Sequence, residues 1–350
     1  MSSGRAAFPS SQRRGGAKRR GGQFGETFRR SSIEASPYRA RASRHPVCAA
    51  SPLTVGASTP PLRGGECAAG LLALLFVAVF SVALFAQTLP FEPTHESGAS
   101  VTGAFEGWFK NNDGSFSLVL GYFNRNTKQV IDLPVGPNNR IEPGGPDQGQ
   151  PTHFLIGRQW GMFTIKVPAD FGKNKLTWTI AANGQTTVIP ASLHPDYEIS
   201  PHLEAATVNT PPVLRFEEKG PSAQGPPGIT VERNAKMGSP LNLTIWVEDD
   251  AKLSTSSGAP PRNLGPPVTI RWSKYRGPGT VRFESEQPVV EKLAGGTPGV
   301  HFVGKAGTTA TFSAPGDYIL HVVLNDYSGD GGGGFQCCWT SGKVNVKVAP

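Results

Sequence analysis

Two adjacent cysteines near the end of the chain have the clearest capacity for chemistry. Cys337 and Cys338 follow the glycine run 331–334. Neighbouring cysteines can close a small disulfide ring, remain as free thiols, or bind a soft metal such as copper or zinc as thiolates. His321 and His301 lie on nearby expected strands, and His321 is the candidate partner of the two cysteines in such a metal site.

The sequence leaves these three states of the cysteines open. The spacing of Cys337, Cys338 and His321 matches no characteristic metal motif. Strand alternation turns His321 away from the core and is expected to place it in solvent. Cys48 and Cys67 precede a long apolar run, so they are expected on the other side of a membrane. Cys337 and Cys338 therefore have only each other or an external ligand as partners.

Acidic residues gather where two expected strands end. The candidate calcium ligands of these two ends are Glu248, Asp249, Asp250, Asp326 and Asp330. If the two ends lie together, their carboxylate oxygens are the hard ligands that calcium prefers. The spacing does not match the twelve-residue calcium loop, so ordinary solvated loop carboxylates are the alternative.

Catalytic motifs are missing from the sequence. It contains no Gly-x-Ser-x-Gly, no His-Glu-x-x-His and no phosphate-binding glycine loop. His153, His194 and His202 stand among polar residues and prolines, as surface histidines do. We assign no residue to catalysis and expect no cofactor, with copper, zinc or calcium as the alternatives.

A long apolar run at 68–86 divides the chain. A signal-peptide core has about 7–15 apolar residues and a membrane-spanning helix has about 20, so the run lies between the two. Basic residues precede it, which places the following residues outside the cytoplasm. Cleavage after Ala86 and retention of 66–86 as a membrane anchor both stay open. In either case we expect a periplasmic, cell-surface or secreted protein.

The basic charge belongs to the residues before that run. Residues 1–65 are rich in Arg, Gly, Ser and Pro and contain only Glu26 and Glu34 as acids, so they are expected to be a disordered tail, unless the start site is assigned too early. The formal net charge of +8 therefore arises in the tail. The remainder is nearly neutral, and we expect no nucleic-acid partner for the protein.

Period-two alternation predicts an all-β protein after the run. Residues 95–205 and 211–349 each read as a series of short strands separated by turns. Asn183-Gly184 between two alternating segments predicts a type I′ hairpin. Residues 134–151 read as a long loop rich in Pro and Gly, either functional or mobile. We interpret the two segments as tandem immunoglobulin-like β-sandwiches.

The second segment resembles a known family. Trp272, the GPGTVRF stretch at 277–283, ATFSAPGDYILHVVLND at 310–326 and the alternating valines at the end are similar to PKD-type modules of cell-surface proteins. The resemblance covers about 240–349 and implies a seven-stranded immunoglobulin-like sandwich used for adhesion, spacing or ligand binding. It also implies that Trp272 packs in the core and that the hydroxyl of Tyr318 reaches nearby backbone at a strand-entry corner. The glycine-rich loop with Cys337 and Cys338 departs from the family pattern.

These observations favour a non-enzymatic extracytoplasmic protein. It would present the end loops of its β-sandwiches to an envelope protein or carbohydrate, with a membrane contact through 68–86 if that run is uncleaved. The alternative is an envelope metal-binding accessory protein or enzyme that uses Cys337, Cys338 and His321. A purely structural spacer is a third hypothesis, which predicts no discrete ligand.

Overall fold

The computed structural model describes residues 93–350 except 206, 253–264, 297–298 and 328–336. The predicted tail at 1–65, the apolar run with its flank at 66–86, and Asp330 lie outside the described residues. Within the described part, regular structure is β-strand apart from one 3-10 turn, Pro195–Tyr197. None of the described residues forms a helix with the length and hydropathy to cross a bilayer.

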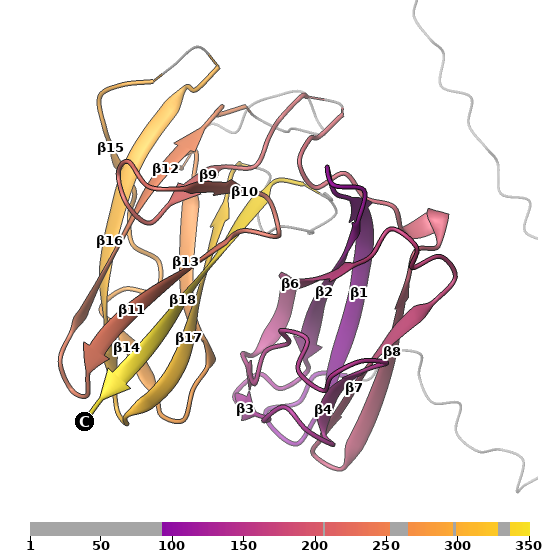
Figure 1. The fold of residues 1–350 in the computed structure, drawn as a ribbon. Helices are drawn as coiled ribbons and strands as arrows, with labels where there is room; N and C mark the ends of the chain where they lie inside the picture. The colour runs from indigo at the N-terminus through magenta and orange to yellow at the C-terminus, as the bar shows by residue number, and fades with distance from the viewer. Residues whose placement is uncertain (1–92, 206, 253–264, 297–298, 328–336) are drawn as a thin grey trace, which may run out of the picture. The chain divides into compact units, whose positions relative to one another are not determined.

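The first half of the described chain builds two three-stranded antiparallel sheets and a short ribbon (Figure 1). One sheet has the order β1-β2-β6, with β1 at Val101–Lys110, β2 at Phe116–Asn124 and β6 at Gly157–Val167. The other has the order β4-β7-β8, with β4 at Asn139–Glu142, β7 at Lys175–Ala182 and β8 at Gln185–Ser192. The ribbon pairs β3 (Ile131–Asp132) with β5 (His153–Phe154).

Local sequence explains the β7–β8 hairpin. Asn183 and Gly184 connect the strands with φ angles of 50° and 75°, which confirms the predicted turn. The long loop predicted at 134–151 is only partly a loop, because it contains β4, whose Asn139 pairs with Ile180 of β7. Pairing with a strand far along the chain gives this segment its extended form, which its Pro and Gly content did not indicate.

The two N-terminal sheets share one apolar core. Alternate residues of β1, β2 and β6 meet those of β4, β7 and β8, with Phe154 of β5 among them. The largest buried side chains contributed by these strands are Trp178, Tyr122, Phe154, Leu118, Leu120, Ile141 and Ile180. Trp178 lies at the centre, where its indole nitrogen donates to Oδ1 of Asn139 at 3.0 Å and satisfies the buried donor.

The second half builds two larger sheets. One has the order β10-β9-β12-β16-β14, with β15 also paired to β16. Its strands are β9 (Val213–Arg215), β10 (Ser222–Gln224), β12 (Leu241–Asp249), β14 (Val281–Phe283), β15 (Glu291–Lys292) and β16 (Phe302–Phe312). The other has the order β11-β18-β17-β13, with β11 at Ile229–Lys236, β13 at Thr269–Arg276, β17 at Gly316–Asn325 and β18 at Trp339–Ala349 (Figure 1). Only the β11–β18 pair is parallel among the described strand pairs of these two sheets.

The C-terminal sheets enclose a second core. Leu243, Ile245 and Val247 of β12 face it from one side. The even-numbered residues of β17 and β18 face it from the other side, and they include Val344, Val346 and Val348. Both sheets therefore follow the alternation predicted from the sequence. Trp272 is 1% exposed within this core, which confirms its expected packing.

Tyr318 occupies the corner where β17 begins. Its hydroxyl donates to the carbonyl of Ala314 at 2.8 Å and accepts from the backbone N–H of Gly279 at 2.9 Å. The hydroxyl therefore connects the turn before β14 to the start of β17, as the family resemblance of this segment implied. A β-carbon at Gly277 would lie 2.1 Å from the Tyr318 ring, so the ring also requires glycine at that turn.

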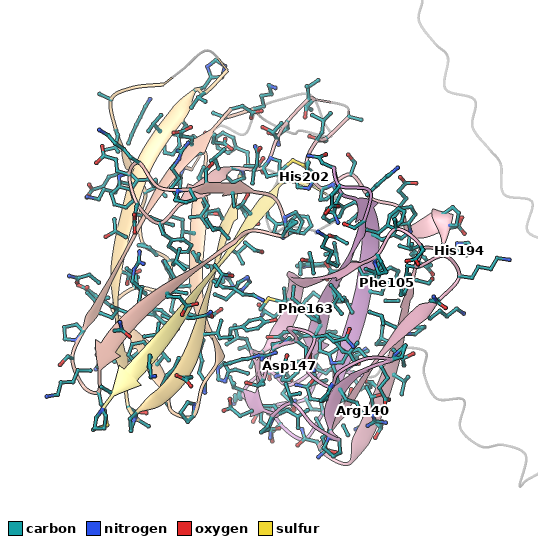
Figure 2. All side chains as sticks on the ribbon, in the orientation of Figure 1. Phe105, Arg140, Asp147, Phe163, His194 and His202 are labelled. Atoms are coloured by element: carbon teal, nitrogen blue, oxygen red, sulfur yellow. A yellow bond between two sulfur atoms is a disulfide. The ribbon has the colours of Figure 1, made fainter. Side chains whose placement is uncertain are left out.

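The two halves are packed against each other within one compact unit. Tyr275 of β13 belongs to the N-terminal core, and Trp339 of β18 packs with Phe109, Val119 and Ile199. Asp147 of the 134–151 segment, labelled in Figure 2, forms an ion pair at 2.8 Å with Arg276. The outer face of the β11-β18-β17-β13 sheet is thus covered by protein where these side chains lie.

Replacing Tyr318 by Phe tests the corner. The Tyr318→Phe variant keeps the ring but leaves the half-buried N–H of Gly279 without its acceptor and the carbonyl of Ala314 without its donor, so we expect a loss of about 1–2 kcal/mol in the free energy of unfolding. Urea denaturation followed by tryptophan fluorescence measures it. Tyr197→Phe is the matched control, because Tyr197 is exposed and its substitution should change stability little. Equal stability of both variants would contradict the role of Tyr318.

Candidate functional site

The structure brings most of the chemically capable residues to one end of the C-terminal sheets. β12 ends at Asp249, β17 ends at Asn325 just before Asp326, and β18 begins at Trp339 just after Cys338. Asn325 and Trp339 are direct partners in the β17–β18 ladder, so Asp326 and Cys338 leave the sheet side by side. We call the cluster formed by Asn209, Asp249, Asp250, Asp326, Cys337 and Cys338 the loop-end cluster.

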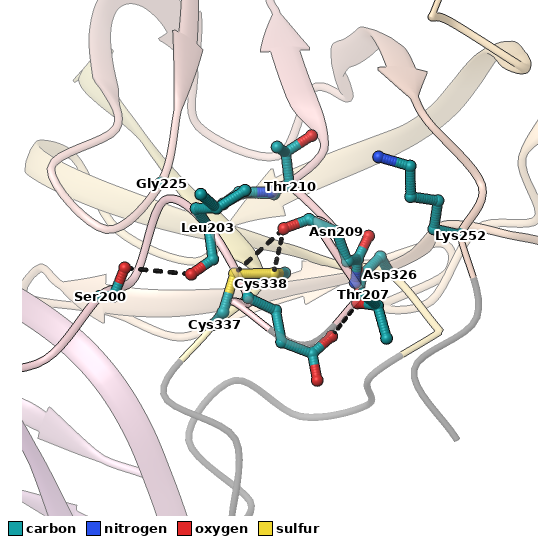
Figure 3. Close-up of a disulfide and its surroundings, with 12 residues drawn as sticks. Ser200, Leu203, Thr207, Asn209, Thr210, Gly225, Lys252, Asp326, Cys337 and Cys338 are labelled. Atoms are coloured by element: carbon teal, nitrogen blue, oxygen red, sulfur yellow. Dashed lines mark hydrogen bonds between the residues drawn. A yellow bond between two sulfur atoms is a disulfide. The ribbon is translucent and has the colours of Figure 1, made fainter. Parts of the chain in front are cut away.

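Cys337 and Cys338 form a disulfide with each other. Of the three states that the sequence left open, this is the one in the structure. Both cysteines are buried, and the carbonyl oxygen of Asn209 lies 3.6 Å from Sγ of Cys338 and 4.0 Å from Sγ of Cys337 (Figure 3). Disulfide sulfurs carry no proton, so these are close contacts that hold the Asn209 backbone against the ring.

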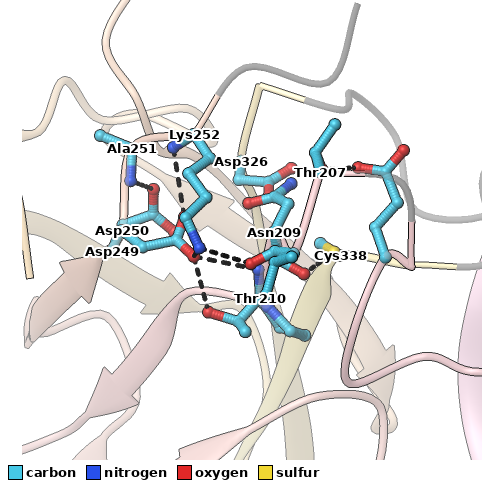
Figure 4. Close-up of polar contacts among 12 residues, drawn as sticks. Thr207, Asn209, Thr210, Asp249, Asp250, Ala251, Lys252, Asp326 and Cys338 are labelled. Carbon is cyan, nitrogen blue, oxygen red and sulfur yellow. Dashed lines mark hydrogen bonds and ion pairs between the residues drawn. The ribbon is translucent and has the colours of Figure 1, made fainter. Parts of the chain in front are cut away.

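Asn209 connects the disulfide to the carboxylates. It is fully buried, and its Nδ2 donates to Oδ2 of Asp326 at 2.6 Å (Figure 4). Its Oδ1 has no hydrogen-bond partner among the described residues. Sequence reasoning missed Asn209 because its partner is 117 positions away, and no local pattern around it signals that contact.

Asp250 is fixed by the same segment. Its Oδ2 accepts hydrogen bonds from the backbone N–H of Thr210 at 3.2 Å and from the Thr210 hydroxyl at 3.1 Å. Lys252 Nζ lies 3.3 Å from that oxygen and also donates to the carbonyl of Val208 at 2.5 Å (Figure 4). Asp250 therefore has its own cation, and the chain from 208 to 210 is held on both sides.

Asp249 is the electrostatically unusual member of the cluster. Its Oδ2 accepts the backbone N–H of Ala251 at 2.7 Å, while its buried Oδ1 has no partner among the described residues. Burial, together with the negative charges of Asp326 and Asp250, raises the pKa of the Asp249 carboxyl to about 7, although the Ala251 N–H opposes the shift. The cluster thus holds an excess of oxygen acceptors over donors.

Glu248, another proposed calcium ligand, does not join the cluster. Glu248 points to the opposite side of β12, where its Oε1 pairs with Nη1 of Arg215 at 2.5 Å. Asp330 lies outside the described residues. In the part of the chain that the structure describes, no three His, Cys, Asp or Glu side chains are arranged to hold a metal ion. Asp249, Asp250 and Asp326 are the members of the predicted acidic set that do come together.

His321 is separated from the cysteines, and its expected exposure is wrong. It does face away from the C-terminal core, but it is buried at 1% exposure because the N-terminal sheets cover that face of β17. Its ring lies 5.5 Å from the ring of Tyr275, and burial lowers the pKa of the imidazole to about 3. Asn325 is four positions further along β17, about 13 Å from His321, which is too far for His321 to share a ligand with Cys338.

The remaining histidines occupy unrelated places. The backbone N–H of His301 donates to the carbonyl of Asp249 at 3.0 Å, while its side chain is exposed. His194 and His202 are exposed, as expected from the sequence, and His153 is half-buried with its Nδ1 at 2.7 Å from Asp132. The structure does not gather these histidines into a common site.

No protein-family model matches this chain, and no curated protein does. Solved structures similar to it include a family 123 glycoside hydrolase from Clostridium perfringens, with 10% identity, a TM-score of 0.19 and coverage of 34% of this chain and 22% of that chain. Domains 4 and 5 of the S-layer protein SbsC match with 12% identity, a TM-score of 0.18 and coverage of 72% and 98%.

A protein of unknown function from Porphyromonas gingivalis is also similar, with 10% identity, a TM-score of 0.19 and coverage of 71% of this chain and 100% of that chain. The chain spans about a fifth of the length of the glycoside hydrolase. Similarities at these identities and TM-scores do not indicate a function.

Asp249→Asn tests the electrostatics of the loop-end cluster. Because the folded-state pKa of Asp249 is raised from 3.8 to about 7, the wild type loses stability as the pH rises from about 4 to about 7, and the full loss persists above that window. The variant carries no charge at this position, so at pH 8 we expect it to be more stable than the wild type by about 2–4 kcal/mol. Near pH 4 this electrostatic advantage should vanish.

Urea denaturation at pH 4.5 and pH 8 measures both values. Asp317→Asn, at an exposed position of β17, is the control and should show no comparable pH-dependent gain. A difference between Asp249→Asn and the wild type that does not grow with pH would contradict the assignment.

Proposed function

We propose that this is a non-enzymatic extracytoplasmic protein that binds an envelope protein or carbohydrate through the loop-end cluster. Two tandem immunoglobulin-like β-sandwiches, at about 95–205 and 211–349, form its folded part. The C-terminal one is of the PKD type. Support for that type comes from Trp272 in the core and from the Tyr318 hydroxyl, which bridges Gly279 and Ala314.

Export is supported by two independent features. The apolar run at 68–86 follows a basic tail, as a signal peptide or an N-terminal anchor does. The Cys337–Cys338 disulfide suits an oxidising compartment, because cytosolic thiols are kept reduced. Together they favour a location in the periplasm, at the cell surface or in the medium.

The observation that carries the binding proposal is the loop-end cluster itself. Residues 207–210, 249–252, 326–327 and 337–338 meet there, and the disulfide, the Asn209–Asp326 hydrogen bond and the Asp250–Thr210 hydrogen bonds fix them. Loops held by a rigid sandwich are common binding surfaces. The unpartnered oxygens of Asn209 and Asp249 are buried, so Lys252, whose side chain is 40% exposed, is the charged group here that a partner can reach, and it favours a partner that offers oxygen acceptors, such as a sugar or an acidic side chain.

The metal-binding alternative has less support. It requires thiolates at Cys337 and Cys338, whereas these sulfurs are bonded to each other. It also requires His321 near them, whereas His321 is buried against Tyr275 on another part of β17. For calcium, Asp249 and Asp326 remain candidate ligands. Glu248 does not, because its carboxylate forms an ion pair with Arg215.

Co-sedimentation with isolated cell-envelope polysaccharide and membranes tests the proposal. The double variant Asp250→Ala, Lys252→Ala removes an ion pair at the loop-end cluster, and we expect it to weaken binding of the full-length protein about tenfold or more. Asp113→Ala with Lys166→Ala removes a comparable ion pair from the N-terminal sheets and is the matched control. Equal binding by both variants, or no binding by the wild type, would count against the loop-end cluster.

Metal analysis of the purified protein distinguishes the binding proposal from the metal-binding alternative. The binding proposal predicts no stoichiometric copper or zinc in the wild type. One equivalent of metal that disappears in Cys337→Ser and Cys338→Ser would instead support the metal-binding function and would remove the basis for the loop-end binding role.

A further inference from the structure

The strand pairing of β16 contains a gap on one side. β14 and β15 both pair with the same side of β16 (Figure 1), but among the described strands neither reaches Gly307. The chain between them turns to the other sheet instead, where the carbonyl of Glu286 accepts the N–H of Trp272 at 2.7 Å. Gly307 is therefore left at an open part of the sheet edge.

The backbone of Gly307 points into this gap. The N–H of Glu284 donates to the carbonyl of Thr309 at 2.9 Å, and the N–H of Leu293 donates to the carbonyl oxygen six positions earlier on β16, that of Val303, at 2.8 Å. Odd-numbered residues of β16 thus direct their backbone groups to this edge. Gly307 is exposed, and no described residue bonds its N–H or carbonyl there, so one donor and one acceptor are available to a ligand.

Glycine at position 307 also leaves space above the strand. Even-numbered residues of β16 point into the C-terminal core, so this position belongs to the outer face of the sheet. Its φ is not positive, and a β-carbon built on it would meet no atom closer than 3.9 Å. Neither the backbone conformation nor a close contact requires glycine here, in contrast to Gly277. The missing side chain leaves a depression in the surface.

Two neighbouring hollows follow this seam between β16 and the strands β14 and β15. Each has a volume of about 560 Å³, within the range of about 300–1,000 Å³ that is typical of ligand pockets. Glu284 lines both, and its Oε2 accepts the hydroxyl of Thr309 at 3.3 Å, which places the carboxylate over β16 between them. The other exposed or half-buried polar residues include Arg282 and Thr311 in one hollow, and Gln287, Glu291 and Lys305 in the other.

The charged groups along the hollows balance one another. Two carboxylates, of Glu284 and Glu291, stand against the cations of Arg282 and Lys305, and none of the four forms an ion pair with a described residue. Nζ of Lys305 lies 5.3 Å from the ring centre of Trp246, so this ammonium stands at the margin of its hollow. A charged ligand therefore gains no net attraction, whereas a neutral polar ligand finds both donors and acceptors.

The shape of the gap argues against a protein strand as the occupant. Adding a strand to a sheet edge uses a row of free backbone groups. Here β14 and β15 occupy the edge of β16 on both sides of Gly307, so the row is interrupted. A polar chain that lies across the outer face meets no such limit.

We propose that the two hollows bind an uncharged oligosaccharide, with one sugar seated on Gly307 and its hydroxyls bonded to Glu284 and Gln287. A sugar hydroxyl both donates and accepts, which suits a carboxylate, an amide and the free backbone groups of the glycine. Thr244, which pairs with Gly307, is five positions from Asp249 on β12, or about 17 Å. The site is thus separate from the loop-end cluster, and the inference does not depend on the proposed function.

A glycan array followed by calorimetry of the full-length protein tests the site. The array includes cellopentaose, chitopentaose and maltopentaose, and we expect the wild type to bind at least one neutral glycan with little dependence on salt. Gly307→Val fills the depression with a residue that strands favour, so the fold should be kept while the affinity falls about tenfold or more. Gly145→Val is the matched control, because Gly145 is also exposed with open space around it but lies outside the hollows.

Glu284→Ala keeps the test decisive if Gly307→Val does not fold. It removes the carboxylate that lines both hollows, and the affinity should fall about fivefold or more. Glu286→Ala removes an exposed carboxylate of the same segment that lines neither hollow, and it should bind like the wild type.

Three outcomes overturn the proposal. One is that the wild type binds no neutral glycan, and another is that it binds charged glycans alone. The third is binding that survives Glu284→Ala but is lost in the double variant Asp250→Ala, Lys252→Ala, which would place the glycan at the loop-end cluster. Loss of binding in Glu284→Ala with full binding in that double variant is the result expected for the hollows.

Discussion

The insertion of Tyr275 into the N-terminal core is the interaction on which the rest of the described structure depends. Tyr275 belongs to β13, yet its ring packs among the residues of the N-terminal sheets, and its hydroxyl donates to the carbonyl of Gly149 at 2.5 Å. Its own carbonyl accepts the N–H of Thr152 at 3.2 Å. Burying such a ring contributes about 1.5–3 kcal/mol, and the two hydrogen bonds fix its orientation. The C-terminal sheet therefore has protein on both faces.

This covered face explains why polar residues of β17 and β18 are buried. His321, Ser341 and Trp339 all have polar atoms without partners among the described residues, and all three lie on the face turned to the N-terminal sheets. An isolated sandwich would leave these side chains in water, where they need no protein partner. Packing of the second half against the first removes that water.

The loop-end cluster obeys a different constraint. The sheets end there, so the polar groups of the converging chain segments have no strand partner. Their hydrogen bonds must instead come from side chains and backbone of the neighbouring segments. The disulfide, Asn209 and Asp250 accomplish this for the chain at 207–210, while Asp249 is left beside two like charges. The strands behind this end position the segments, and the cluster keeps buried acceptors on Asn209 and Asp249 that have no partner among the described residues.

The sequence by itself determined the all-β fold, the Asn183-Gly184 turn and the inward-facing valines of β18, which depend on local alternation and turn chemistry that nearby residues encode. The core role of Trp272 and the corner at Tyr318 were implied by the family resemblance of that segment. It also placed Asp249, Asp250 and Asp326 at strand ends. Only the tertiary structure decided that Asn209 joins them to the disulfide, that Glu248 turns to Arg215, and that His321 is buried. Those outcomes depend on contacts between residues far apart in the chain, and a local pattern carries no information about which surface will cover a given face.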